Sequence, residues 1–313
     1  MAIETFHTLI AKNKRNSFIL IFIFMLFFVG IGLLIGSVWG GGEMAFAWTV
    51  AAIAAAVAFI LTVMSYYGGS SALLGLSKAR EIRKSDDPQL FNVVEELSLA
   101  GGLPLPRIYL IDDTAMNAFA TGRNPKHASV AITTGLRQKL TRDQLQGVMA
   151  HELSHVRHYD ILYAMLMAVM VGVLVMLCDV FLRSVWWGAA TGGRRRRSRK
   201  EGGGAAQAIL LIIAIVLAII APILARIIHM ALSRQREYLA DAGAVELTRN
   251  PDGLAGALAR LAGDKEVLEV ANRATAPLYI VHPIKKFEKR ASSILSTHPP
   301  VEDRIKRLMS LTV

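Results

Sequence analysis

Hydrophobic residues are gathered into four long segments, and these define the plan of the chain. They cover residues 17–39, 44–67, 161–182 and 205–228, and each is almost wholly apolar. A helix of about 20 apolar residues crosses the hydrocarbon core of a bilayer, which is about 30 Å thick. A buried helix of a soluble protein can account for one such segment, but four together indicate a membrane protein.

The four segments fall into two pairs, and each pair predicts a helical hairpin. A short glycine turn, residues 40–42, joins the first two segments. The first segment is expected to stay in place as an anchor, because its apolar core is too long for a cleavable signal peptide and no Ala-x-Ala site follows it. The second pair encloses a glycine- and arginine-rich loop, residues 192–204, which is expected to be a solvated connector.

The chain turns polar at residues 68–160 and again at residues 230–313. The residue patterns of these two parts predict short regular elements: helices over 87–100, 233–248 and 301–311, and strands over 107–111 and 128–133. A polar stretch, residues 112–127, lies between the two strands. We expect the two polar parts to form one domain, which is preceded by the first hairpin (1–67) and interrupted by the second (161–229).

The charge balance is strongly basic. The chain has 313 residues, of which 53% are apolar, a mean hydropathy of +0.43 and a formal net charge of +11. The excess of Lys and Arg indicates membrane orientation and contact with anionic lipid, and no nucleic-acid partner is expected, because no aromatic-rich basic groove motif accompanies it. Cys178 is the only cysteine, so an intrachain disulfide is excluded.

The clearest chemical signature is the sequence His-Glu-Leu-Ser-His at residues 151–155. Side chains four residues apart on a helix point the same way, so His151 and His155 can hold one Zn²⁺ between them. Glu152 lies on the neighbouring face, where a carboxylate can activate a water molecule. Thr141 is a good N-cap for the helix that this arrangement requires, and apolar residues follow it at helical spacing.

A catalytic zinc site needs a third protein ligand, and no histidine follows His155 at the metzincin spacing. Glu237 is the favoured candidate. His155 lies about six residues before the third apolar segment and Glu237 about nine after the fourth, so an antiparallel pair of helices would bring both to a height of roughly 10 Å on one side of the membrane. A surface charge beside two arginines is the alternative for Glu237.

Asp241 follows Glu237 by one helical turn and lies on the same face. There it is expected to orient a ligand histidine through the second ring nitrogen. Three other carboxylates are weaker candidates for the third ligand, because no comparable geometric argument applies to them: Glu246, Glu266 and Glu269.

With these residues in view, the chain resembles the HtpX-type membrane zinc metalloproteases, bacterial quality-control endopeptidases of the gluzincin group. The matching stretches are 151–155 with Asp160, Glu-Tyr-Leu-Ala-Asp-Ala-Gly at 237–243, Asn-Ala-Phe-Ala-Thr-Gly at 117–122, and Ser-Thr-His-Pro at 296–299. The plan of four hydrophobic segments matches as well, so the resemblance covers nearly the whole chain. The basic run at 194–200 is an elaboration that is not carried over.

The resemblance implies a mainly α-helical membrane protein with two hydrophobic helical hairpins and an α+β, zincin-like catalytic domain containing a small β-sheet. It implies His151, His155 and Glu237 as the ligands of one zinc ion per chain, and Glu152 as the general base. It also implies a multi-pass protein of the bacterial inner membrane whose active site faces the cytoplasm. Its partners would be the lipid bilayer and unfolded or membrane-protein substrates, as in a stress response.

By the same resemblance, Asn117, Ala118 and Phe119 would form the substrate-side edge of the cleft, where an extended peptide binds as an added strand. An ordinary loop with a glycine turn is the alternative for this stretch. His298 precedes the last helix, and its imidazole is expected to stabilise the oxyanion above the zinc, with a structural role as the equal alternative. Arg304 is a weaker candidate for the same task, and His158 is expected to be structural.

The leading functional hypothesis is therefore a membrane-anchored, zinc-dependent endopeptidase. An intramembrane zinc protease is the first alternative, which the charged neighbours at residues 157–160 disfavour because charges are costly in lipid. A non-catalytic membrane scaffold with a structural zinc is the second. Glu152 disfavours it, because a structural site has no use for a base beside the metal.

The distribution of basic residues predicts the orientation. Lys12, Lys14 and Arg15 precede the first apolar segment, whereas the loop at 40–43 carries no basic residue, so the N-terminal tail and everything from Gly68 on are expected in the cytoplasm. Seven basic residues between 183 and 200 disagree with four full crossings. Either the second hairpin does not fully cross, or the earlier segments fix the orientation; full crossing is favoured because both segments are long enough.

Overall fold

The computed structural model describes residues 6–39, 43–174, 176, 234–264, 266–269, 278–280 and 299–311. The fourth apolar segment, the later part of the third, the basic loop and His298 lie outside these residues. The chain divides into two compact units. One contains residues 1–17, 66–169 and 229–313, and the other contains residues 18–65 and 170–228.

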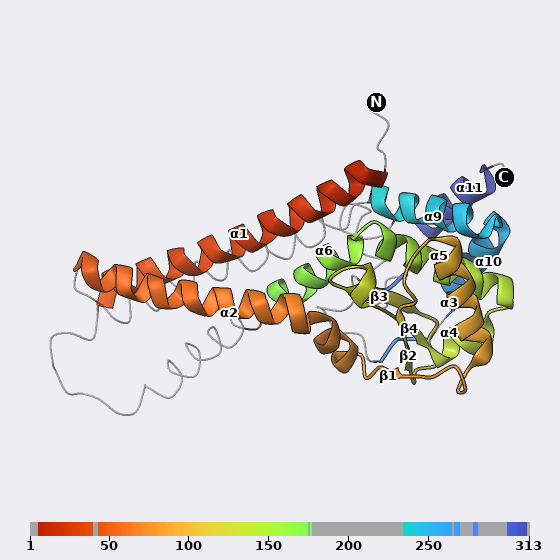
Figure 1. Cartoon of the computed structure of the whole chain (residues 1–313), viewed down its shortest axis with the longest axis horizontal. Helices are drawn as coiled ribbons and strands as arrows, with labels where there is room; N and C mark the ends of the chain where they lie inside the picture. The colour runs from red at the N-terminus through yellow and green to blue at the C-terminus, as the bar shows by residue number, and fades with distance from the viewer. Residues whose placement is uncertain are drawn as a thin grey trace. The chain divides into compact units, whose positions relative to one another are not determined.

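The first hairpin consists of two long helices, α1 (Phe6–Trp39) and α2 (Met44–Leu76), which lie side by side in Figure 1. Among the described residues these two helices are long and apolar enough to cross a membrane. A Cβ atom added to Gly32 of α1 would lie 2.7 Å from the Cα atom of Ala51 of α2, so the two backbones touch. Small residues permit this close packing between membrane helices.

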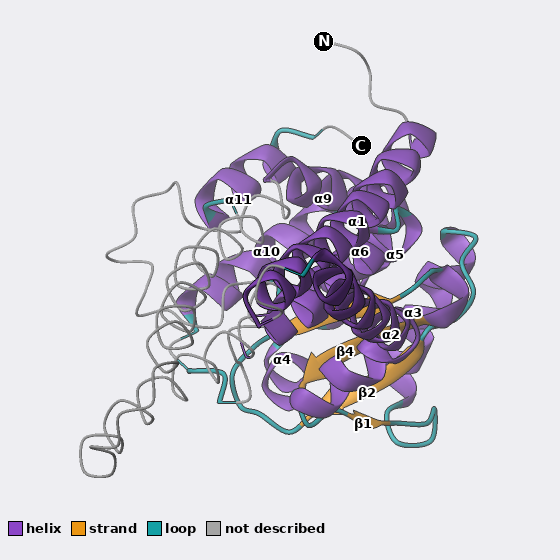
Figure 2. Ribbon diagram, turned by 90° about the vertical axis from the view of Figure 1, so that its left-hand side faces the viewer, coloured by secondary structure: helices purple, strands orange, loops and turns teal. Residues whose placement is uncertain are grey.

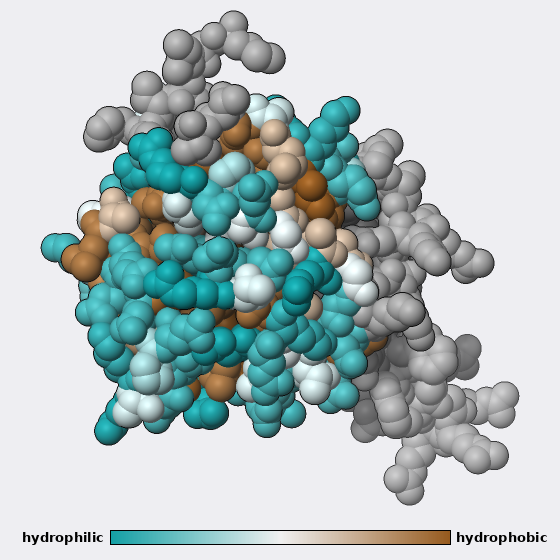
Figure 3. Space-filling view, turned by 90° about the vertical axis from the view of Figure 1, so that its right-hand side faces the viewer, coloured by the Kyte–Doolittle hydropathy of each residue, from teal (hydrophilic) through white to brown (hydrophobic). Residues whose placement is uncertain are grey.

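Large apolar side chains cover the outside of this hairpin. Phe18, Phe59 and Met64 are 73%, 62% and 63% exposed, and further exposed Ile, Leu, Val and Phe residues lie between them along both helices. Such an apolar surface is unfavourable in water and suits lipid. The other unit differs, since hydrophilic residues cover most of the described surface on the face shown in Figure 3.

A four-stranded mixed sheet forms the centre of the polar unit. The strands are β1 (Arg80–Glu81), β2 (Arg107–Ile111), β3 (Ala118–Gly122) and β4 (Ala128–Thr133), in the order β1-β2-β4-β3. β2 and β4 run parallel, while β1 and β3 are antiparallel to their neighbours, and Figure 2 shows β4, β2 and β1 following one another. The two strands expected from the sequence are thus present, with β1 and β3 in addition.

Strand β3 corrects the expectation of a polar stretch at residues 112–127. All five of its residues are buried, and it pairs along its whole length with β4, with Ala118 opposite Ile132 and Gly122 opposite Ala128. Its sequence, Ala-Phe-Ala-Thr-Gly, consists mainly of small residues that fit between packed layers. β3 therefore forms an edge of the sheet beside the helix that carries the His-Glu-Leu-Ser-His sequence.

Two helices of this unit begin directly after a residue whose side chain caps them. Asp87 caps α3 (Pro88–Ala100), and Thr141 caps α5 (Arg142–Arg157) through a capping box with Gln144. The expected helices at 87–100, 233–248 and 301–311 appear as α3, α9 (Arg234–Thr248) and α11 (Val301–Met309). The described residues also contain α4 (Thr134–Lys139), α6 (Asp160–Leu166) and α10 (Pro251–Gly263), a 3-10 turn at Pro125–His127 and a π-helical turn at Met167–Val171.

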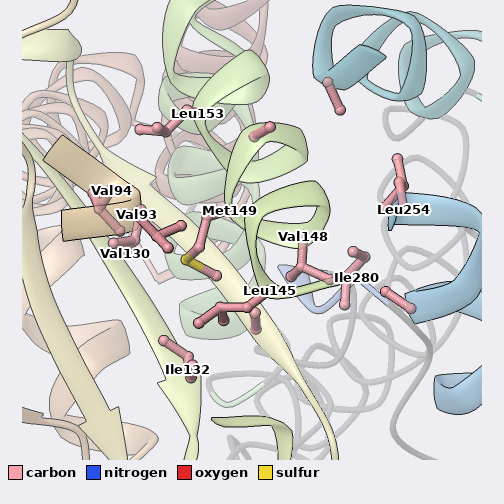
Figure 4. Close-up of a cluster of buried hydrophobic side chains, with 14 of the residues drawn as sticks. Val93, Val94, Val130, Ile132, Leu145, Val148, Met149, Leu153, Leu254 and Ile280 are labelled. Carbon is pink, nitrogen blue, oxygen red and sulfur yellow. The ribbon is translucent and has the colours of Figure 1, made fainter. Parts of the chain in front are cut away.

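The main hydrophobic core surrounds α5. Its side chains pack between the sheet, α3 and α10, as Figure 4 shows; the labelled members are Val93, Val94, Val130, Ile132, Leu145, Val148, Met149, Leu153, Leu254 and Ile280. Burying a side chain of this size stabilises the fold by about 1.5–3 kcal/mol. A smaller cluster, which includes Leu74 of α2, Phe119 and Tyr279, contains the other apolar residues of the sheet. Helix α5 is therefore held on several sides.

Candidate metal centre

Helix α5 brings the two histidines of the sequence signature together. His151 and His155 are one turn apart, and their Nε2 atoms lie 3.2 Å from each other. His151 is 1% exposed, while His155 is partly buried. The pair points into the cavity described below rather than into the apolar core, as the helical spacing predicts.

Helix α9 supplies the third member of the cluster. The carboxylate of Glu237 lies 3.6 Å from Nε2 of His151 and 3.6 Å from Nε2 of His155, and these three residues form the group of possible metal ligands found among the described residues. Ligand atoms at about 2.0–2.1 Å from a tetrahedral zinc ion are about 3.4 Å from one another. Separations of 3.2–3.6 Å between nitrogen and oxygen donors fit that ion.

Each histidine also meets a carboxylate at its other ring nitrogen. Nδ1 of His151 lies 3.0 Å from Oδ1 of Asp241, and Nδ1 of His155 lies 3.1 Å from Oδ2 of Asp160. Such carboxylates fix the tautomer and the orientation of histidines that bind metals. Asp241 thus lies where the sequence predicted. Asp160 was noted only as part of a matching stretch, and the signal that could have found it is its position five residues after His155.

A bend in the chain brings Asp160 back to His155. Tyr159 adopts a left-handed conformation (φ 62°) between α5 and α6, so the first residue of α6 faces the last turn of α5. Asn13 of α1 fixes this bend, because its side-chain amide donates hydrogen bonds to Oδ1 of Asp160 (2.6 Å) and to the carbonyl of His158 (2.9 Å). Asn13 and Asp160 are both buried, which makes this contact between distant segments strong.

Arg304 of α11 lies beside the ligand cluster and pairs with Asp241. Its guanidinium is 1% exposed and donates two hydrogen bonds to Asp241, of 2.6 and 2.9 Å, and lies 3.4 Å from Glu237. Burial raises the pKa of Asp241, but the charge of Arg304 and the bonds from Arg304 and His151 outweigh it, so this pKa lies below its usual value. The carboxylate of Asp241 is therefore held by two partners, the guanidinium of Arg304 and the imidazole of His151.

Glu152 lies beside the ligands without belonging to the cluster. It is 2% exposed, and burial raises the pKa of its carboxyl group, although a hydrogen bond from the backbone of Ala120 opposes this effect. Glu152, His151, His155 and Glu237 line one cavity of about 40 Å³. A buried carboxyl group with a raised pKa in such a cavity suits a role in proton transfer.

The outer edge of β3 forms one wall of this cavity and is already paired. The carbonyl oxygen of Ala118 accepts a hydrogen bond of 3.0 Å from the amide of Ile280, and the Phe119 ring packs against Tyr279 with centroids 5.2 Å apart. Arg304 also donates a hydrogen bond of 3.2 Å to the carbonyl of Ile280. Residues 278–280 thus lie along the edge at which Asn117, Ala118 and Phe119 were expected to receive a substrate.

The weaker ligand candidates lie elsewhere. Glu246 is exposed and pairs with Arg157, Glu266 accepts a hydrogen bond from Thr114, and the backbone amide of Glu269 donates to Asp113. His158 is buried at the C-cap of α5, where its carbonyl accepts the hydrogen bond from Asn13, in keeping with a structural role.

Comparisons with known proteins agree with this site. The profile of Peptidase family M48 matches residues 84–312. The curated "Protease HtpX homolog" of Dictyoglomus thermophilum is 43% identical over 97% of this chain and 94% of its own length, and that of Caldanaerobacter subterraneus is 41% identical over the whole of both chains. The "Protease HtpX homolog" of Lactobacillus acidophilus is 40% identical over 96% of this chain and 97% of its own.

Among solved structures, the crystal structure of S. mikatae Ste24p is similar over 95% of this chain and 67% of that chain, with 18% identity and a TM-score of 0.47. The match to the family profile and the relatives at about 40% identity, which extend over nearly the full length, decide the assignment. The chain belongs to peptidase family M48 and is a membrane metalloprotease of the bacterial HtpX type.

Proposed function

We propose that this chain is a zinc-dependent endopeptidase that cleaves unfolded or membrane-protein substrates as part of quality control. His151, His155 and Glu237 hold one Zn²⁺, and Glu152 is the general base. The single observation that supports this most is the buried cluster of two imidazoles and a carboxylate with tetrahedral spacing, beside a second carboxyl group in the same cavity. A structural zinc site would have no use for Glu152.

Zinc, when bound, supplies Lewis-acid catalysis, since it acidifies a water molecule and polarises the carbonyl group of the scissile bond. Glu152 accepts the proton of that water and donates it to the leaving amine. Asp241 and Asp160 hold the two imidazoles as neutral ligands in the required orientation. An extended substrate pairs with the outer edge of β3 at Ala118, which gives affinity without demands on its sequence.

The variant Glu152→Gln tests the mechanism. It keeps the shape of the side chain but removes the base, so cleavage of unfolded casein by the purified protein should fall by a factor of about 10² to 10⁴. Metal analysis should still find one zinc per chain. Glu246→Gln is the matched control, because this exposed residue undergoes the same chemical change outside the site. Near-normal cleavage by the Glu152→Gln variant would exclude the proposed role.

We also propose that the catalytic unit, formed by residues 68–160 and 230–313, faces the cytoplasm from the inner membrane. The basic residues before α1 and their absence from the loop at 40–43 support this orientation. With Cys178 replaced, a cysteine-directed probe that cannot cross the membrane should label a cysteine at Ser198 in the basic loop and miss one at Ser85. Labelling at Ser85 in intact cells would contradict the cytoplasmic assignment.

A further inference from the structure

A second, polar cavity lies where α2 meets the sheet, on the opposite face from α5. It measures about 50 Å³, and hydroxyl and guanidinium groups line most of it. Tyr66, Tyr67 and Ser70 come from the later part of α2, Arg107 from β2 and Ser129 from β4, together with Arg123, which directly follows β3. None of the described residues that line it is acidic.

Two arginines, Arg107 and Arg123, contribute to this cavity. Among the described residues, neither Arg107 nor Arg123 lies within ion-pair distance of a carboxylate, although other arginines of this unit, such as Arg137 with Asp87, are paired. The Arg123 guanidinium instead stacks over the ring of Tyr67, 5.1 Å from its centroid, which fixes its direction. Two guanidinium groups beside several hydroxyls complement the oxygens of a phosphate group.

The strand register explains why these groups converge. Arg107 is paired with Ser129 across β2 and β4, so their side chains project from the same face of the sheet. Ser129 is 3% exposed, which places its hydroxyl at the base of the cavity, whereas Arg107 is exposed at its rim. Tyr109 also lines the cavity; its hydroxyl interacts with Arg107 and donates a hydrogen bond of 3.1 Å to Glu81, so this carboxylate lies beside the cavity without lining it.

The position of the cavity along α2 matches the surface of a bilayer. Residues 44–65 of α2 span about 33 Å at 1.5 Å per residue, close to the thickness of the hydrocarbon core, and the cavity begins with the next residue, Tyr66. Tyrosine is typical of this boundary. The two helices touch where Gly32 of α1 meets Ala51 of α2. Arg15 lies 17 positions before Gly32, and Gly68 lies 17 positions after Ala51, so the basic start of α1 and this part of α2 are equally far along their helices from that contact.

We infer that this cavity is a binding site for the phosphate of an anionic phospholipid headgroup. Arg107 and Arg123 bind the phosphate oxygens, and the hydroxyls of Ser70 and Ser129 complete the hydrogen bonding. The membrane span that leads directly into the cavity favours a lipid over a soluble phosphate as the source of the ligand.

The test measures lipid binding by the full-length protein in a neutral detergent. Phosphatidylglycerol, phosphatidylcholine and inorganic phosphate are titrated separately, and native mass spectrometry counts the bound molecules. We expect one phosphatidylglycerol per chain to bind in preference to the other two. In the double variant Arg107→Gln/Arg123→Gln this affinity should fall at least tenfold. The matched control is Arg80→Gln/Lys126→Gln, which removes the same charge at exposed positions outside the cavity and should leave the affinity unchanged.

Several outcomes would overturn the inference. Unchanged phosphatidylglycerol binding in the double variant would show that the cavity is not the site. An equal loss in the control variant would show only a general attraction between charges. Saturation by inorganic phosphate, without a preference for the lipid, would show a site for soluble phosphate. If the double variant does not fold, Arg123→Gln alone, compared with Lys126→Gln, should still weaken binding at least threefold, and equal affinities would reject the site.

Discussion

Gly147 is a point of very close approach between α5 and α10, and adding one methyl group there tests how firmly the metal-site helix is held. A Cβ atom at Gly147 would lie 2.6 Å from the backbone nitrogen and 2.8 Å from the Cα atom of Leu254. The shorter distance falls 0.8 Å short of the 3.4 Å at which ordinary contact begins. Because both partner atoms belong to the backbone, no side-chain rotation can relieve the clash.

The expected cost of Gly147→Ala follows from two opposing effects. Overpacking of a well-filled interior costs about 1–3 kcal/mol, while alanine is favoured over glycine inside a helix by about 0.8–1 kcal/mol. The free energy of unfolding should therefore fall by up to about 2 kcal/mol, which corresponds to a melting temperature lower by up to about 8 °C. Peptidase activity should fall by more than this loss of stability alone would cause, because a displacement of about 1 Å in an active site can lower the rate about 100-fold.

Thermal unfolding in detergent and cleavage of unfolded casein measure the two effects. Gly263→Ala is the matched control on the facing helix, since its new Cβ atom would meet no other atom within 4 Å. This variant should unfold at the wild-type temperature or slightly above it. If Gly147→Ala keeps both the stability and the activity of the wild type, the tight packing of α5 against α10 is not what positions the metal ligands.

Three further predictions concern single side chains. Glu237→Ala should lose most of the bound zinc by elemental analysis, whereas Glu246→Ala should keep it; a fully loaded Glu237→Ala protein would place the third ligand elsewhere. Arg304→Met should lower the free energy of unfolding by about 3–5 kcal/mol, because it leaves the buried carboxylate of Asp241 unpaired. Adding Asp241→Asn to this variant should restore part of the lost stability. Equal loss in the single and the double variant would show that the two residues are not coupled. Asp87→Ala, which removes the N-cap of α3, should cost about 0.5–2 kcal/mol in a chemical unfolding experiment, and an unchanged midpoint would show that this cap is dispensable.

Features that depend on nearby residues could be predicted from the sequence. Helix α5 was expected because Thr141 is a capping residue and apolar residues follow at helical spacing, and the facing of His151 and His155 follows from the helix itself. Glu237 could be placed beside the two histidines because the ends of two long apolar segments predict how far each residue lies from the membrane. The first helical hairpin followed from the lengths of its apolar segments, whereas the zincin-like catalytic domain with its small sheet was implied by the resemblance to the HtpX-type proteases.

Features that depend on distant residues could not be predicted in this way. Strand β3 was missed because it is buried on both faces, so its sequence does not alternate between polar and apolar residues. The hydrogen bond between Asn13 and Asp160 joins residues 147 positions apart, and neither residue has a local pattern that indicates the other. The engagement of Arg304 by Asp241 depends on the packing of α11 against α9, which periodicity does not determine.

If substrate binds at β3 as proposed, the hydrogen bond from Ile280 to Ala118 makes that binding an exchange of partners. A peptide that pairs with this edge must take the place of a segment of the same chain, which is tethered and therefore present at a high effective concentration. The apparent affinity of the peptide is its intrinsic affinity multiplied by the fraction of molecules in which the edge is open. Long extended chains, which form many backbone pairs at once, would overcome this competition more easily than short peptides or folded surfaces. On the proposed binding mode, the resting protein would therefore select extended chains before any side chain is recognised.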